Sequence, residues 1–351
     1  MSPRMASRLH ATDLPSRGHD DIVIVWRVWE SCSLACRFCG YSRELGRPRM
    51  AMKLPAAIAF GKVLGEVQQD GGRSILVSWL GGEPLDWPQL PRLARIFHRD
   101  CGLRLGVTTN GLPIHSLQVR ANLLADYEQV TISIDGLAPF HDQVRGMPGL
   151  YERLRESVSR LRDDDAHGQL WRRVNTVLMR GNIDAFGRFC EEMADWGFHE
   201  LTFNQLGGNE RPEFYPANRL LQQQVARFAR ELPDIRRRMA DRGMIVRGSE
   251  RYLARIAATT SNRQIAIDDC RPGTEFLFVD ALGRISPCSF SSEHYGIPIT
   301  QIDSADAFLD LPRRFRELRR RNRLTACDDC HATHVFDKFR SESENAAIAA
   351  P

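Results

Sequence analysis

Three cysteines within eight residues are the most reactive group in the sequence. Cys32, Cys36 and Cys39 have the spacing C-x3-C-x2-C, shortly after an apolar run. Three thiolates on one loop can bind three irons of a [4Fe–4S] cube, which leaves the fourth iron without a protein ligand. A small chelating molecule can bind that iron and receive an electron. Structural zinc sites prefer four ligands, so three cysteines fit zinc poorly.

A second cysteine set lies near the C-terminus. The apolar runs 276–279 and 284–286 flank turn residues, and they predict a β-hairpin that places two of these cysteines at one end. A C-x2-C unit can then close the site. Four thiolates suit either a zinc ion or a fully ligated [4Fe–4S] cluster. The set consists of Cys270, Cys288, Cys327 and Cys330.

A glycine–acid motif supplies further candidate residues. Gly81 and Gly82 let the backbone approach a ligand closely, and Glu83 offers a carboxylate that can bind an ammonium group. Taken alone, this stretch is explained more simply as a turn between a strand and a helix.

The elements that must position these residues alternate along the chain. We expect helices at 54–67, 89–98, 117–127, 151–162 and 185–196, and strands at 22–26, 74–80, 103–108, 129–134, 174–178 and 200–204. Such alternation predicts parallel βα units with right-handed crossovers. Ligands of such sheets lie at the carboxyl ends of the strands, where most of the polar and glycine motifs fall.

The amino-acid composition restricts the classes of protein to which this chain can belong. The 351 residues are 42% apolar and 26% charged, with a net charge of +4, as in a soluble globular protein. No apolar run approaches the roughly 18 residues that span a membrane, and we expect a cytoplasmic protein without a signal peptide. The nine cysteines then indicate metal or redox chemistry rather than disulfides. Cys101 and Cys190 belong to neither set and are expected to be inert core thiols.

The cysteine spacing, with Phe38 directly before the third cysteine, resembles the radical S-adenosylmethionine (radical SAM) superfamily. Gly81, Gly82 and Glu83 are similar to the superfamily's GGEP motif, which implies that they hold the amino group of SAM. The resemblance also implies a partial (β/α)6 TIM-like barrel and a SAM-binding [4Fe–4S] cluster. Reductive cleavage of SAM would give a 5′-deoxyadenosyl radical that abstracts hydrogen from a C–H bond.

The stretch Ser-Ile-Asp-Gly, followed by His-Asp and an arginine, resembles the SPASM/twitch members of the superfamily. This implies that Ser133 and Arg145 contact the carboxylate and ribose of SAM, the arginine by two parallel hydrogen bonds. Asn110 is similar to the family pattern at the floor of the site, although a turn asparagine is equally consistent. Val177 lies on the fifth strand, where the family uses main chain near the adenine.

The C-terminal cysteines follow the pattern C-x12-G-x4-C and then C-x2-C, which resembles a twitch domain with one auxiliary [4Fe–4S] cluster. After Cys330 no cysteine remains for a second auxiliary cluster. We therefore expect a small C-terminal β-hairpin/helix iron–sulfur domain beside the α/β barrel. The expected division is an arm at 1–20, the core at 21–215, a helical connector at 216–262, the twitch/SPASM-like domain at 263–340 and a tail at 341–351.

The resemblance leaves the substrate open. About 20 residues precede the first strand, too few for a leader-binding domain, which favours oxidation of a sugar, aminocyclitol or nucleoside in natural-product biosynthesis. Modification of a ribosomally made peptide is the alternative, and a non-catalytic iron–sulfur or zinc-binding electron carrier is a remote one. Candidate substrate contacts follow the sixth strand: Asn204, Gln205, Glu210 and Arg211.

The expected partner is a flavodoxin- or ferredoxin-like electron donor. Segment 313–323 holds seven arginines, which form either a solvated helix face or a surface for an acidic electron-transfer protein or a phosphorylated substrate. Few aromatic residues interrupt the run, so nucleic acid binding is not expected. No membrane partner is expected either.

Overall fold

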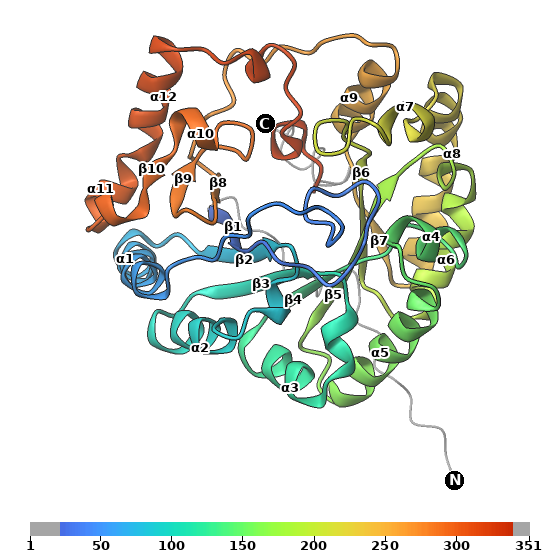
Figure 1. Cartoon of the computed structure of the whole chain (residues 1–351), viewed down its shortest axis with the longest axis horizontal. Helices are drawn as coiled ribbons and strands as arrows, with labels where there is room; N and C mark the ends of the chain where they lie inside the picture. The colour runs from blue at the N-terminus through green and yellow to red at the C-terminus, as the bar shows by residue number, and fades with distance from the viewer. Residues whose placement is uncertain (1–21, 340–351) are drawn as a thin grey trace.

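A parallel sheet forms the centre of the molecule (Figure 1). The computed structural model describes residues 22–339, so the predicted arm and tail lie outside the described residues. Six neighbouring parallel strands follow chain order, as the sequence predicts: β1 (Ile22–Trp29), β2 (Ile75–Gly81), β3 (Arg104–Thr109), β4 (Gln129–Ser133), β5 (Trp171–Leu178) and β6 (Glu200–Gln205). The α/β barrel fold is thereby confirmed, and the carboxyl ends of these strands meet at one edge.

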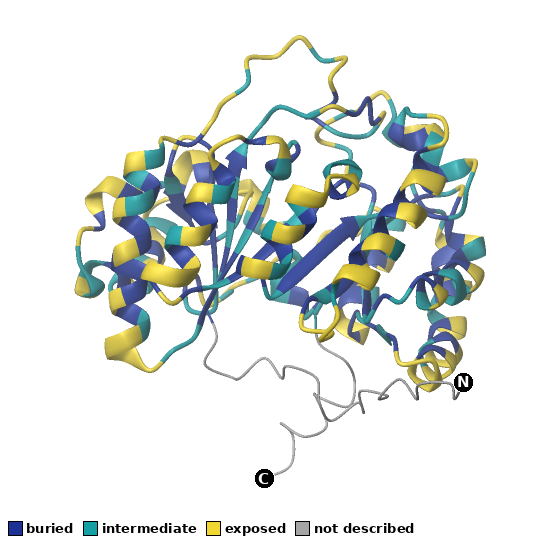
Figure 2. Ribbon diagram, turned by 90° about the horizontal axis from the view of Figure 1, so that it is seen from below, coloured by how far each residue is buried: buried dark blue, intermediate teal, exposed yellow. Residues whose placement is uncertain are grey.

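Helices connect these strands and cover the sheet with their apolar faces (Figure 2). In α5, the buried residues Leu150, Leu154, Val158 and Leu161 recur at helical spacing, which is why this segment packs as a helix. The helices of the core are α1 (Leu54–Gly71), α2 (Leu90–Arg95), α3 (Leu117–Asp126), α4 (Phe140–Arg145), α5 (Leu150–Asp164) and α6 (Phe186–Asp195). A π turn follows α2 at Ile96–Asp100, and short 3-10 turns lie at Pro84–Asp86, Leu112–His115 and Ile183–Ala185.

The core between the sheet and its helices is rich in aromatic rings. Trp26 of β1 packs against Trp79 of β2 with ring centres 5.5 Å apart, and Trp79 lies 5.1 Å from Phe97. Both tryptophans are fully buried, so this corner fixes the relative position of the first two strands. No helix within residues 22–339 is long and apolar enough to cross a membrane.

The connector differs from the sequence prediction. It contains the helices α7 (Tyr215–Asn218), α8 (Gln222–Asp241) and α9 (Glu250–Thr260), but also the strand β7 (Ile245–Val246). This strand pairs in parallel with β6 and extends the sheet. Helix α4 was also not predicted. Both elements are too short to show a periodic hydrophobic pattern. They are instead stabilised by pairing and packing with segments elsewhere in the chain, which the local sequence does not reveal.

The C-terminal region contains the predicted hairpin, in which β8 (Phe276–Val279) and β9 (Arg284–Ser286) are antiparallel. Strand β8 also pairs in parallel with β1, so the hairpin continues the barrel sheet. The division of the chain into domains therefore stays a prediction. The remaining elements are α10 (Ser292–Tyr295), β10 (Ile297–Pro298), α11 (Ala305–Leu309), α12 (Leu311–Arg321) and 3-10 turns at Ile299–Gln301, Thr325–Cys327 and Thr333–Phe336.

Candidate active site

The loop that carries Cys32, Cys36 and Cys39, called the cysteine loop below, follows β1 at the edge of the sheet where the parallel strands end. Cys36 is buried, and Cys32 and Cys39 are half-buried. Burial raises the pKa of Cys36 to about 12, with nearby Arg145 opposing the rise and the two other thiols adding to it. The amide of Asn110 donates to Cys32 Sγ at 3.6 Å, and the N–H of Tyr41 donates to Cys39 Sγ at 3.4 Å. Buried cysteine sulfurs that accept N–H hydrogen bonds are suited to bind an iron–sulfur cluster, because its iron cations neutralise the negative charge of the thiolates.

The glycine–acid motif packs against the start of this loop. The N–H of Gly82 donates to the carbonyl of Trp29 at 2.7 Å, and the N–H of Glu83 donates to that of Ser31 at 2.8 Å. A Cβ atom added to Gly81 would collide with the Trp29 carbonyl, and one on Gly82 with the Ser31 carbonyl. Glycine is therefore needed because the end of β2 approaches the backbone that leads into the cysteine loop.

Glu83 connects the ends of β2 and β3. Its side chain is fully buried, and it accepts hydrogen bonds from the Thr109 hydroxyl at 2.8 Å and the Asn110 N–H at 2.7 Å. The N–H of Leu85 is a third donor, at 3.1 Å. Burial raises the pKa of Glu83 to about 7 despite these bonds. Because the Asn110 side chain also contacts Cys32, the carboxylate helps to position the cysteine loop.

A buried ion pair lies on the other side of the loop. Arg145 Nε is 2.6 Å from Asp135 Oδ2, and the other oxygen of Asp135 accepts the N–H of Val177 at 2.9 Å. The Arg145 guanidinium also lies 5.3 Å from the centre of the Phe38 ring. Asp135 thus brings together three residues that the sequence singles out, although the sequence interpretation gave it no role.

Further polar residues hold Asp135 in place. Its N–H donates to His141 Nδ1 at 3.0 Å, and Asn182 Nδ2 donates to its carbonyl at 2.6 Å. Burial lowers the pKa of His141 to about 4, so this imidazole is neutral and can accept that bond at neutral pH. Asp142 instead accepts the N–H groups of Gly149 and Tyr151 at the start of α5. This supports a capping role.

The loop after β6, residues 206–215, packs on the cysteine loop. The Phe214 ring lies 6.4 Å from the Phe38 ring, and the Arg37 guanidinium lies 5.6 Å from the centre of the Phe214 ring. The Glu210 carboxylate lies so close to Gly40 that a Cβ atom there would collide with it. The two loops therefore pack against each other, with aromatic and charged groups on both loops.

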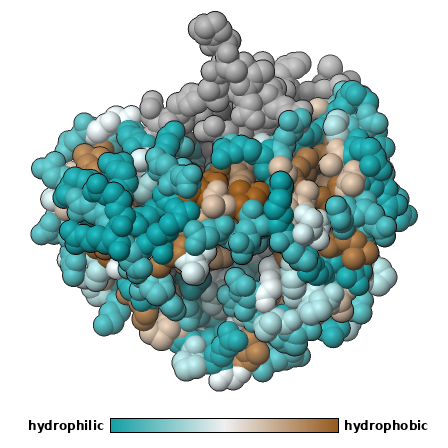
Figure 3. Space-filling view, turned by 90° about the horizontal axis from the view of Figure 1, so that it is seen from above, coloured by the Kyte–Doolittle hydropathy of each residue, from teal (hydrophilic) through white to brown (hydrophobic). Residues whose placement is uncertain are grey.

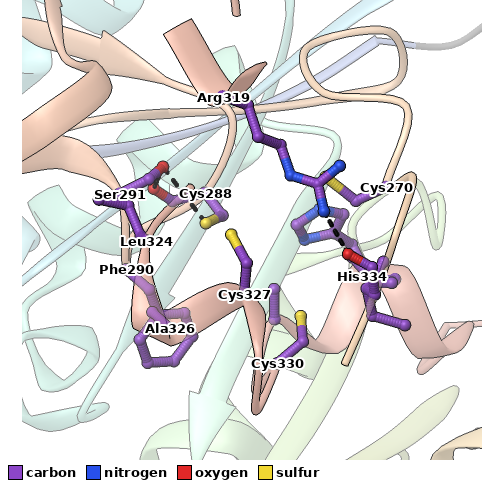
Figure 4. A pocket seen from close by; sticks show the side chains of 13 residues that line it. Cys270, Cys288, Phe290, Ser291, Arg319, Leu324, Ala326, Cys327, Cys330 and His334 are labelled. Carbon is purple, nitrogen blue, oxygen red and sulfur yellow. Dashed lines mark hydrogen bonds between the residues drawn. The ribbon is translucent and has the colours of Figure 1, made fainter. Parts of the chain in front are cut away.

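The second cysteine set also comes together in space. All four thiols line one cavity, with Arg319 and His334 on its wall (Figure 4). Ser291 Oγ lies 3.3 Å from Cys288 Sγ. Burial raises the pKa of Cys330 to about 11, and the other three thiols add to the rise. Within residues 22–339, no three His, Cys, Asp or Glu side chains are placed to hold a single metal ion.

Helix α9 anchors the loop that carries Cys327 and Cys330. Buried Arg255 forms an ion pair with Asp329, and the Ile265 N–H donates to the same carboxylate at 3.2 Å. The N–H of Cys330 donates to the Ile265 carbonyl at 2.9 Å. The thiols are thus held by contacts between segments that are distant in the sequence.

Comparison with known proteins identifies the family. Residues 26–215, more than half of the chain, match the profile of the Radical SAM superfamily. The chain belongs to this superfamily. The chain is similar to an AdoMet-dependent heme synthase from Methanosarcina barkeri, with 28% identity over 76% of each chain. The AdoMet-dependent heme synthase of Nitratidesulfovibrio vulgaris is 29% identical over 50% of this chain and 47% of its own length.

Solved radical SAM structures share the fold. SuiB from Streptococcus suis, bound to S-adenosylmethionine, aligns over 90% of this chain and 72% of its own with a TM-score of 0.61 and 15% identity. The enzyme anSMEcpe with bound AdoMet aligns over 90% of this chain and 88% of its own with a TM-score of 0.62 and 15% identity. At these identities the likeness concerns the fold. The match to the family profile, and not these structures, identifies this chain as a radical SAM enzyme with iron–sulfur chemistry.

The individual roles of the SAM-site residues stay predictions for this radical SAM enzyme. Ser133 ends β4 opposite Asn175 in register, on the edge that carries the other motifs. Glu83, Asn110 and Cys32 meet on one side of the cysteine loop, and Arg145, Phe38 and Val177 on the other. In the structure, both the Val177 N–H and the Arg145 Nε–H donate hydrogen bonds to the Asp135 carboxylate.

Two candidate substrate contacts have partners within the protein. Asn204 accepts from Lys338 Nζ at 2.9 Å, and Gln205 donates to the Thr259 hydroxyl at 3.0 Å. Lys338 is buried, and it also donates to Asn175 at 3.0 Å. No sequence pattern marked this lysine, because its position depends on how the C-terminal segment returns to β5 and β6.

Replacing Gly82 with alanine tests the positioning of the cysteine loop. The added methyl would collide with the Ser31 carbonyl, so the loop must shift. We expect a loss of about 1–3 kcal/mol in the free energy of unfolding, as for overpacking, and less iron per chain. Chemical denaturation and iron analysis measure both. Gly71→Ala is the control, because no atom of the described residues 22–339 lies within 4 Å of its added methyl. Unchanged iron content in Gly82→Ala would contradict the prediction.

Proposed function

We propose that this radical SAM enzyme oxidises a carboxylate-bearing tetrapyrrole. The observation that carries the proposal is the relative named AdoMet-dependent heme synthase, which aligns over 76% of both chains. A relative named Fe-coproporphyrin III synthase from the same organism is 30% identical over 37% of this chain. A relative named pre-heme d1 synthase, from Dinoroseobacter shibae, is 32% identical over 39% of this chain. All three names refer to tetrapyrrole products.

The surface of the two packed loops supports this substrate class. Exposed Arg37 on the cysteine loop lies over Phe214 on the covering loop, and exposed Arg47 and half-buried Tyr215 belong to the same two segments. A planar macrocycle can stack on aromatic rings, and its carboxylates can pair with guanidinium groups. These residues thus offer both kinds of contact.

The cysteine loop has the donor set for the cofactors. Cys32, Cys36 and Cys39 would hold a [4Fe–4S] cluster. With this cluster and SAM bound, the site would supply a 5′-deoxyadenosyl radical that takes hydrogen from a substrate C–H bond. Phe38 and the Asp135–Arg145 pair, which contact each other beside the cysteine loop, would help to position the bound SAM.

The four C-terminal thiols would hold a second [4Fe–4S] cluster. Their burial and mutual repulsion fit a group that neutralises thiolates. A cluster with four protein ligands can accept the electron left on the substrate, which makes the net reaction a two-electron oxidation. Zinc remains the alternative, and metal analysis distinguishes the two.

The other substrate classes have weaker support. The relatives reported above are not named for a sugar or an aminocyclitol, so those two predictions have gained no support. A relative named GTP 3',8-cyclase, from Chlorobaculum tepidum, is 28% identical over 58% of this chain, which keeps a nucleoside-type substrate as an alternative. SuiB has been solved with the precursor peptide SuiA, but at 16% identity this likeness concerns the fold alone. Peptide modification and a non-catalytic carrier are therefore left as outcomes of the experiment.

Metal content and SAM cleavage test the proposal together. We expect about eight irons per chain after anaerobic reconstitution, and 5′-deoxyadenosine when dithionite supplies electrons. We also expect iron-coproporphyrin III to bind with a shift of its Soret absorbance and to be consumed as SAM is cleaved. About four irons with one zinc would remove the oxidative role of the second site. Absence of tetrapyrrole binding would overturn the substrate proposal, and absence of SAM cleavage would overturn the enzymatic one.

The pH dependence of SAM binding tests the role of Glu83. Its pKa is raised to about 7 by burial, so the carboxylate that can hold an ammonium group is formed only above that pH. We expect SAM affinity to fall by up to about tenfold per pH unit below pH 7. Equilibrium dialysis between about pH 5.5 and pH 8 measures it.

Without SAM, the folding stability of the protein changes with pH in the opposite direction to SAM affinity. Between the ordinary pKa of a glutamate, near 4.5, and about 7, the folded state binds more protons than the unfolded state, so stability decreases as pH rises. Bound SAM should offset that loss, and the melting temperature should therefore rise more with SAM at pH 8 than at pH 5.5. Glu83→Gln should bind SAM weakly at every pH. A variant with wild-type affinity would contradict the assignment.

A further inference from the structure

The cavity of the four C-terminal thiols opens beside the end of helix α12. Its lining includes Phe290, which is 42% exposed, and exposed Ala326, next to Cys327 (Figure 4). On the face seen from above in Figure 3, several apolar patches lie among hydrophilic side chains, one of them near the middle. An apolar centre with a polar rim is the usual anatomy of a protein interface.

Arginines dominate the exposed surface of α12, the helix whose Arg319 lines the cavity. Arg316, Arg320 and Arg321 are exposed, and none of them has an ion pair with any described residue within 22–339. By contrast, Arg313 pairs with Asp310 and Glu317. The excess positive charge therefore faces outward.

Other charged groups at the cavity partly balance each other. Arg323 pairs with Asp328, and Arg319 donates to the main-chain carbonyls of Ile267 and Asp268. The exposed carboxylates of Asp268 and Asp269 lie in the segment that precedes Cys270. The rim thus has one acidic segment, and the face of α12 is its uncompensated basic part.

We propose that Arg316, Arg320 and Arg321, together with the apolar rim at Phe290 and Ala326, form the docking surface for an acidic one-electron carrier of the flavodoxin or ferredoxin type. The proposal rests on the proposed function, because it assigns a redox group to the four thiols. One electron would pass from the reduced carrier, which is thereby oxidised by one equivalent, to the enzyme, where it would supply the single electron that SAM cleavage consumes. Charge complementarity steers such encounters and sets their orientation.

A purely structural role for these arginines makes a different prediction. Positive side chains in the last turn of a helix stabilise it through the helix dipole, and this requires no partner. Replacement would then change the stability of α12 but leave carrier binding unchanged. The two roles are separable by measuring both.

Charge reversal tests the surface in the reconstituted full-length protein. The variant is Arg320→Glu/Arg321→Glu, and the control is Arg92→Glu/Arg95→Glu on α2, whose arginines are also exposed and lie away from α12 in Figure 1. Oxidised flavodoxin and oxidised ferredoxin serve as separate probes in calorimetric titrations at low and high salt. We expect the variant to bind at least about tenfold more weakly than the wild type at low salt, and the control to bind normally. High salt should reduce the difference.

Further measurements distinguish a loss of carrier binding from a loss of folding or of bound metal. The neutral variant Arg320→Gln/Arg321→Gln, with iron content and circular dichroism, shows whether the helix and the metal site persist. Carrier-driven 5′-deoxyadenosine formation should fall in the variants, whereas dithionite-driven formation should not. Wild-type affinity in the variants, or no binding of either carrier to the wild type, would overturn the docking surface. Absence of dithionite-driven SAM cleavage in the wild type would instead overturn the proposed function.

Discussion

Replacing Asp135 with asparagine is expected to abolish SAM cleavage and to lower the free energy of unfolding by about 3–5 kcal/mol. Asp135 is fully buried and pairs with Arg145, which is itself buried. Without the carboxylate, an uncompensated guanidinium would remain in the interior beside the cysteine loop. Arg145 would then turn away from the Phe38 ring or draw water into the site. Chemical denaturation and dithionite-driven 5′-deoxyadenosine formation measure the two effects.

A second buried ion pair provides the matched control. Asp165 pairs with Arg172 at 2.6 Å, and the two side chains are 3% and 7% exposed. This pair lies at the start of β5, at the opposite end of the strand from the site. Asp165→Asn should therefore cost similar stability and keep SAM cleavage. Equal loss of cleavage in both variants would mean that Asp135 acts only through global stability.

Removing two C-terminal thiols should separate the two metal sites. In the double variant Cys327→Ala/Cys330→Ala, we expect iron to fall from about eight to about four per chain. The N-terminal loop is intact in this variant, so dithionite-driven 5′-deoxyadenosine formation should persist. Oxidation of iron-coproporphyrin III should be lost, because the electron acceptor is gone. Iron analysis, zinc analysis and product assays check these outcomes.

The two remaining cysteines serve as the control for that experiment. Cys101 and Cys190 are buried in the hydrophobic core and do not line the auxiliary cavity. Cys101→Ala/Cys190→Ala should keep all iron and cost about 1–3 kcal/mol of stability as small cavities form. Loss of one zinc with unchanged iron in the Cys327/Cys330 variant would show that the second site is a zinc site.

Much of the site could be predicted from short stretches of sequence. The cysteine spacing, the glycine–acid motif and the strand–helix alternation are local features, and each depends on a few neighbouring residues. The parallel sheet brings the strand ends together, and Glu83 and Asn110, which follow β2 and β3, are hydrogen-bonded there. The family comparison confirms the radical SAM chemistry.

The particular contacts could not be predicted. Glu83 accepts its hydrogen bonds largely from β3, so its side chain also joins two strands. Asp135 holds Arg145 and Val177 through bonds to a helix and a strand that follow it by 10 and 42 residues. Such pairs leave no periodic pattern, because a buried polar group needs only one partner of the right geometry, from anywhere in the chain.

The sequence by itself determined the barrel type, the grouping of seven cysteines into two sets and the edge of the sheet where the candidate site lies. Only the tertiary structure decided that β8 joins β1, that the loop 206–215 covers the cysteine loop and that Lys338 lies between β5 and β6. The physical reason is that the spacing of residues along the chain sets their relative positions only within one loop or strand. Contacts between distant segments are instead selected by the packing and hydrogen bonding of the whole chain.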